Sequence, residues 1–209
     1  MKIKFDKFFF LGLYVLLSVV INQWINFSLF SSFPENSFGE ILWFCDFTGI
    51  ILGIGLILKN IKLTTLTFVM AVPAQFLWIV DFFMEVFGSG LGRTTVLWSY
   101  GPLVFWASVN LHLILIPFSF YGVWKLGFFK KALKSILIYI FLLLAFSFIF
   151  TLPNENINCV FYSCDGEDPG AGYLEYFILH SLFFWSVIAI ISFYSFKLIF
   201  QKFHCRKKS

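Results

Sequence analysis

Charged residues are scarce in this chain. Only 12% of its 209 residues are Asp, Glu, Lys or Arg, whereas 60% are hydrophobic. A soluble domain has about 25% charged and about 45–50% apolar residues. The scarcity of charge therefore excludes an ordinary soluble domain and indicates that most of the chain is surrounded by lipid.

The apolar segments also lack the alternation of polar and apolar residues that an outer-membrane β-barrel requires. They are continuous, and about 20 apolar residues are enough for one helical crossing. The sequence thus predicts an all-α polytopic membrane bundle of six transmembrane helices, with residues 1–209 as a single domain. The N-terminal segment lacks a small-residue cleavage site, so we interpret it as a retained first span and not as a signal peptide.

Short polar turns and one long polar loop, residues 153–172, separate the predicted spans. The spans cover residues 8–30, 38–58, 63–83, 103–124, 135–152 and 173–200, and Pro73 is expected to break the third. Of the 15 Lys and Arg residues, only Arg93 falls on the outer side of this layout. The positive-inside rule then predicts a multi-pass protein of the inner membrane with both termini in the cytoplasm. Because the positive charge is confined to loops and ends, it does not indicate nucleic-acid binding.

Cysteine is sparse as well, and two of the four cysteines lie in the long outer loop. Cys159 and Cys164 would close a small ring there, in a compartment that permits oxidation, so we predict a disulfide between them. The loop has no His, which argues against a transition-metal site. Asp165, Glu167 and Asp168 leave a calcium loop as a weaker alternative, but they lack the EF-hand spacing. No metal or other cofactor is expected.

Polar residues within the predicted spans are few, and ionisable ones are functional candidates by default. Cys45 and Asp46 stand side by side in the second span, His112 lies in the fourth and His180 in the sixth. At about 1.5 Å per residue, Cys45 and His180 would lie roughly 10 Å, and His112 roughly 14 Å, from the outer ends of their spans. We therefore expect one outward-opening cavity to collect them. The remaining polar residues of these spans include Asn22, Gln23, Asn26, Thr48, Gln75, Asp81, Ser108, Asn110 and Ser181.

This set of side chains permits nucleophilic acyl transfer. A thiol becomes a competent nucleophile once a base removes its proton, which predicts Cys45 as nucleophile and His112 as base. His180 is the alternative base, and a carboxylate such as Asp46 or Asp81 would orient the imidazole, as in a catalytic triad. Gly49 and Gly53, one turn apart on the face of Cys45, would let a neighbouring helix approach closely.

Two other functions remain open. In the first, the protein is a non-catalytic transporter or small-molecule binder, with Asp46, His112 and His180 as proton or ligand sites. The chain has no convincing internal repeat, which counts against an inverted-repeat transporter. In the second, the protein is a scaffold whose polar residues only bond across helices, each contributing about 0.6 kcal/mol.

The run Leu42-Trp43-Phe44-Cys45-Asp46-Phe47, followed by His112 two spans later, resembles the YwaF-like family of six-helix membrane proteins. Asn110-Leu111-His112, with Pro117 five residues after the His, resembles the androgen-induced-gene family of membrane threonine hydrolases. The resemblance covers residues 39–127, and it implies Cys45 as nucleophile, His112 as base and a lipid or acyl substrate from the outer leaflet. The YwaF-like pattern has a His two residues before the Cys, where this chain has Trp43.

Overall fold

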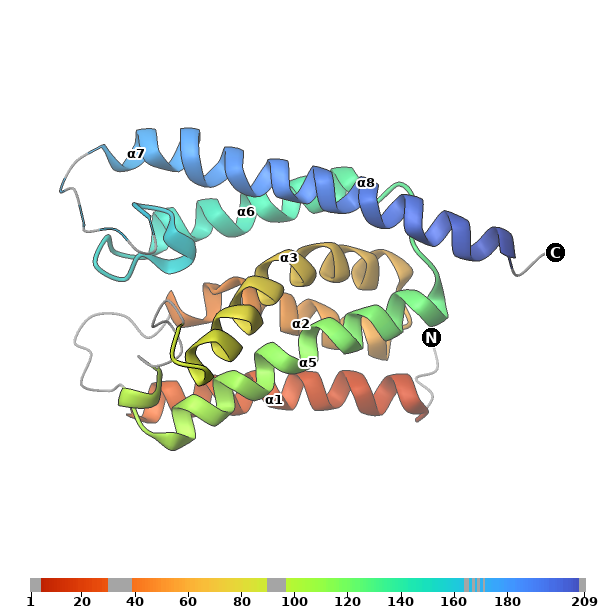
Figure 1. Ribbon diagram of the computed structural model, residues 1–209, viewed down its shortest axis with the longest axis horizontal. Coiled ribbons are helices and arrows are strands. Elements are labelled where there is room, and N and C mark those ends of the chain that lie inside the picture. The colour runs from red at the N-terminus through yellow and green to blue at the C-terminus, as the bar shows by residue number, and fades with distance from the viewer. Residues whose placement is uncertain are drawn as a thin grey trace.

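The computed structural model describes residues 5–29, 39–89, 97–163, 166, 168, 170 and 172–206. Over these residues the chain is helical and contains no strand, which confirms the predicted all-α class. The α-helices, arranged as in Figure 1, are α1 (Lys7–Leu29), α2 (Phe44–Ile57), α3 (Ile61–Val86), α5 (Pro102–Leu126), α6 (Leu133–Phe150), α7 (Tyr173–Tyr176) and α8 (Phe183–Arg206). Short 3₁₀ segments, η1 (Gly39–Leu42) and η2 (Ile157–Cys159), and a π-helical segment, η3 (Phe177–Leu182), complete the described elements.

Five helical segments of the described chain are long and apolar enough to cross a membrane. They correspond to α1, α3, α5, α6 and the continuous segment that begins with α7 and ends in α8. Many large apolar side chains on these helices face outward, as expected for helices in lipid. The chain is therefore compatible with a multi-pass integral membrane protein.

The second predicted span differs most from the expectation. Residues 39–42 form a 3₁₀ turn, and α2 begins only at Phe44. Its 14 residues span about 21 Å at 1.5 Å per residue, less than the roughly 30 Å of a hydrocarbon core. The prediction of one continuous helix over residues 38–58 is therefore wrong, although the segment stays apolar.

Both chain termini lie at the same end of the bundle, together with the α2–α3 and α5–α6 connections (Figure 1). These two connections and the start of α1 supply many of the lysines of the sequence. Among the described residues, these lysines therefore gather at one end of the bundle, in agreement with the charge distribution that the sequence led us to expect. Which side of the membrane this end faces stays a prediction.

Local sequence explains several helix boundaries. The side chain of Asn60 accepts hydrogen bonds from the backbone N–H groups of Lys62 and Leu63, so it caps the start of α3. The carboxylate of Asp6 does the same for α1. Pro73 lies inside α3, which changes direction along its course without ending (Figure 1). The expectation of a break at Pro73 is therefore wrong, because α3 continues through this residue.

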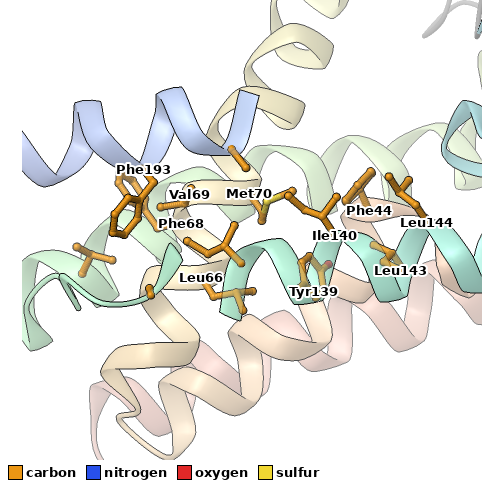
Figure 2. Close-up of a cluster of buried hydrophobic side chains, with 14 of the residues drawn as sticks. Phe44, Leu66, Phe68, Val69, Met70, Tyr139, Ile140, Leu143, Leu144 and Phe193 are labelled. Atoms are coloured by element: carbon orange, nitrogen blue, oxygen red, sulfur yellow. The ribbon is translucent and has the colours of Figure 1, made fainter. Parts of the chain in front are cut away.

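Two apolar clusters hold the bundle together, and α2 and α3 contribute to both. The first lies mainly among α3, α6 and α8, and Figure 2 shows part of it. The second joins α1, α2, α3 and α5, and its buried members are Val15, Val19, Leu52, Leu56, Ala71, Leu111 and Leu115. The second cluster lies directly beside the polar residues of α1 and α2.

Close contact between α1 and α2 depends on two glycines. A Cβ atom on Gly12 would lie 2.5 Å from the carbonyl oxygen of Gly53, and one on Gly53 would lie 2.9 Å from the carbonyl oxygen of Gly12. Backbone atoms cannot move aside as a flexible side chain can, so any larger residue would separate the helices. The expected role of Gly53 in close helix approach is confirmed, and α1 is the helix that approaches.

Candidate functional site

Asp46 is the centre of a buried polar cluster between α1 and α2. Its side chain is 2% exposed. Its Oδ1 accepts a hydrogen bond from Nδ2 of Asn22 at 3.1 Å, its Oδ2 accepts one from the Cys45 thiol at 3.2 Å, and the Gln23 side chain also bonds to it. All three partners are neutral, and the one ion pair among the described residues, Lys59–Asp6, lies at the start of α1.

The position of Asp46 along its helix differs from the sequence-based expectation. Because α2 begins at Phe44, Cys45 and Asp46 lie in its first turn and not about two turns inside a long span. The positive end of the helix dipole therefore favours the carboxylate. The sequence named Asn22 and Gln23 as polar residues of the first span but did not identify them as partners of Asp46.

Asn158 fixes the start of α2 from a distant part of the chain. Trp43, at the N-cap position, provides no side-chain cap. Instead, Oδ1 of Asn158 accepts a bond from the Phe44 N–H at 2.9 Å, while its Nδ2 donates to the Leu42 carbonyl at 2.7 Å and to Ser147 Oγ at 2.9 Å. The sequence analysis missed this residue, whose only local signal is its place beside Cys159 in the long polar loop.

His112 lies on α5 and contacts Ser108 of the same helix and Trp78 of α3. Its Nδ1 lies 2.8 Å from the Ser108 carbonyl oxygen, and its ring stacks on Trp78 with centroids 4.0 Å apart. A carbonyl can only accept, so Nδ1 carries a proton, and the neutral form of the ring then has its lone pair on Nε2. This tautomer is the one that a general base needs.

The structure joins Cys45 to Asp46 and His112 to Ser108, two contacts that the sequence analysis did not predict. It assigns His112 a stacking partner, Trp78, that the sequence analysis did not name. The Cys45–His112 dyad itself stays a prediction.

Three further hydrogen bonds link neighbouring helices. Asn110 accepts a bond from the Tyr14 hydroxyl at 2.8 Å and donates one to Ser18 at 3.0 Å, which ties α5 to α1. The hydroxyl groups of Thr48 and Tyr139 lie 2.8 Å apart and tie α2 to α6. Asn110 is therefore engaged in packing the bundle.

The remaining predicted residues have different surroundings. Gln75 and Asp81 are buried on α3. His180 is exposed and stacks on Tyr176 within the α7–η3 segment, so the expectation that it shares an interior cavity with Cys45 and His112 is wrong. Cys159 is disulfide-bonded, and its predicted partner, Cys164, lies outside the described residues.

The described side chains also bear on metal binding. Among them, no group of three or more His, Cys, Asp or Glu residues could hold a metal ion. The cluster at Asp46 instead offers oxygen atoms from one carboxylate and from neighbouring amides. Such a set binds protons or hard cations through oxygen.

Comparison of the chain with protein-family models, with curated proteins and with solved structures gives no match.

Proposed function

We propose that the protein is a multi-pass protein of the inner membrane, with six crossings and both termini in the cytoplasm, that binds a proton or small cation reversibly at Asp46 as part of solute binding or transport. Five long apolar helices and the basic end of the bundle support the membrane assignment. On this proposal α2, the short apolar helix that is additional to the five long ones, crosses the membrane, and the 3₁₀ segment before it extends the crossing.

The observation that carries the proposal is a buried carboxylate whose bonded partners are neutral. Burying a charge costs several kcal/mol unless an opposite charge compensates it. The dipole at the start of α2 contributes about 0.3–1 kcal/mol and does not offset that cost. A proton or cation that binds and leaves would complete the charge balance, and carriers use intramembrane carboxylates in this way.

Reconstituted vesicles test this proposal. Purified protein in vesicles that contain a pH-sensitive dye is given a proton or sodium gradient, and ion movement is recorded. Asp46→Asn should abolish the protein-dependent signal, whereas Cys45→Ser should retain it. Equal flux in the wild type and in Asp46→Asn would refute the role of this carboxylate.

A second candidate function is lipid acyl hydrolysis or acyl transfer from the outer leaflet. The contact between the Cys45 thiol and the Asp46 carboxylate favours it, because the carboxylate is positioned to hold the thiol proton. The resemblance to the YwaF-like family points to the same cysteine, with His112 as the expected base. In this mechanism the thiolate attacks an ester carbonyl, the ester C–O bond breaks, and the alcohol leaves with the proton that the base took from the thiol; water or a second alcohol then attacks the thioester, takes the acyl group and restores the Cys45 thiol.

Labelling with an acyl-directed probe separates the two candidates. The enzyme proposal requires labelling that Cys45→Ser abolishes and that His112→Ala reduces. Labelling of Cys45 that is unchanged in His112→Ala would exclude the dyad. Full function in a Cys45→Ala, His112→Ala double variant would favour the scaffold role for these residues.

A further inference from the structure

The antiparallel register of α1 and α2 brings the polar end of α1 to the start of α2. Gly12 meets Gly53, Val19 meets Gly49, and Asn22 meets Asp46. Each step toward the C-terminal end of α1 therefore moves toward the beginning of α2. Asn26, one turn beyond Asn22 on the same face, extends this series past the carboxylate.

Two amide oxygens along this face are buried without a hydrogen-bond partner. They are Oδ1 of Asn22 and Oδ1 of Asn26. Asn22 is only 4% exposed, so water outside the bundle does not compensate its oxygen. A buried acceptor without a donor is destabilising, because it has lost its hydrogen bonds to water and gained none within the protein.

Rotating the Asn22 amide does not resolve this. An ionised Asp46 can only accept, so in the state that would bind a cation the amide must present its NH₂ group to the carboxylate, and its oxygen must point elsewhere. Nitrogen and oxygen of one amide are about 2.3 Å apart, given the standard C=O and C–N bond lengths. With the bond of 3.1 Å, the free oxygen of Asn22 lies within about 5.4 Å of the carboxylate oxygen. This limit is close to the roughly 5 Å that one hard cation spans between two oxygen ligands.

We propose that Asn22, Asn26 and Asp46 form a binding site for a small monovalent cation of the sodium class. Oxygen atoms from carboxylates and amides are the ligands of hard cations. One carboxylate supplies a single negative charge, which a monovalent ion balances, whereas calcium sites usually contain several carboxylates. The ion would occupy the side of Asp46 that faces Asn22 and Asn26, and the Cys45 thiol would keep its bond to Oδ2.

This assignment rests on the proposed function and specifies its ligand. A bound cation gives both amide oxygens a partner and neutralises the buried carboxylate. A buried water molecule would satisfy the oxygens alone and leave the charge uncompensated. The two occupants therefore differ in whether stability depends on the cation in solution.

Thermal unfolding of the purified protein in detergent tests the site. The midpoint is measured against increasing NaCl, with choline chloride holding the ionic strength constant. Ligand binding to the native state predicts a midpoint that rises with the logarithm of the sodium concentration once the site begins to fill. Asn26→Ala should lose most of this rise, because it removes one oxygen ligand without removing a bond that holds the fold. Asn154→Ala, an exposed asparagine in the outer loop, is the matched control and should keep it.

Three outcomes would overturn the site: equal midpoints in NaCl and choline chloride, an equal rise in the wild type and Asn26→Ala, or a rise with CaCl₂ only. Asn26→Asp provides a second variant, which should raise the apparent affinity for sodium. If stability depends on sodium but ion flux is equal in the wild type and Asp46→Asn, the site is supported and the proposed function is rejected. Flux that requires Asp46 without any sodium effect would keep the function, with a proton as the ion, and reject the site.

Discussion

Asn158→Ala is expected to release the start of α2 and to destabilise the end of the bundle at which α2 begins. The side chain of Asn158 is 4% exposed and makes three hydrogen bonds, to the Phe44 N–H, the Leu42 carbonyl and Ser147. At about 1 kcal/mol for each bond, their loss amounts to about 3 kcal/mol. Asn158 also has a positive φ of 55°, where Ala costs about 1 kcal/mol more than Gly or Asn.

The expected total for Asn158→Ala is therefore about 4 kcal/mol, against about 3 kcal/mol for Asn158→Gly, which tolerates the backbone but loses the bonds. Unfolding by SDS in mixed micelles measures both values. Asn154→Ala, in the same loop but exposed, should change stability by less than about 0.5 kcal/mol.

Hydrogen exchange locates the effect. In Asn158→Ala the amide of Phe44 and those of the following turn should exchange faster, while amides in the middle of α5 should respond only through global unfolding. If Asn158→Ala and Asn154→Ala have the same stability, or if exchange in the first turn of α2 does not change, then Asn158 is not the cap of this helix.

Three other predictions concern different parts of the bundle. Gly53→Ala should destabilise by about 1–3 kcal/mol in the same unfolding assay, because its Cβ would lie 2.9 Å from the Gly12 carbonyl oxygen, and an unchanged midpoint would contradict the tight α1–α2 crossing. The hydrogen bond from Lys59 lowers the pKa of Asp6, so the stabilisation from this ion pair is present above the unfolded pKa of about 4 and is lost as the pH falls through the lowered value; a midpoint-against-pH curve should show this acid loss in the wild type and not in Asp6→Asn. Reduction of the Cys159 disulfide should lower stability by about 2 kcal/mol by the loop-entropy model, and Cys159→Ser should lower it equally and remove any response to reductant.

The class of the protein and most of its helices were predictable from sequence. Five of the six expected spans match the long helices within a few residues. Hydropathy and charge succeed here because they sum contributions of neighbouring residues, and a membrane-spanning helix satisfies its backbone bonds within itself. The cap at Asn60 was equally local, since the residue and the N–H groups it bonds lie within three positions.

The candidate site depended on contacts that no local pattern contains. Asp46 meets Asn22 across 24 positions of sequence, and Phe44 meets Asn158 across 114. The late start of α2 follows from the second of these contacts, because Trp43 offers no cap of its own. Sequence alone determined that Cys45, Asp46 and His112 belong to apolar segments. Only the tertiary structure decided that Asp46 is bonded by α1 and that His112 stacks on α3, because hydrogen bonding and stacking depend on which helices become neighbours and at what rotation.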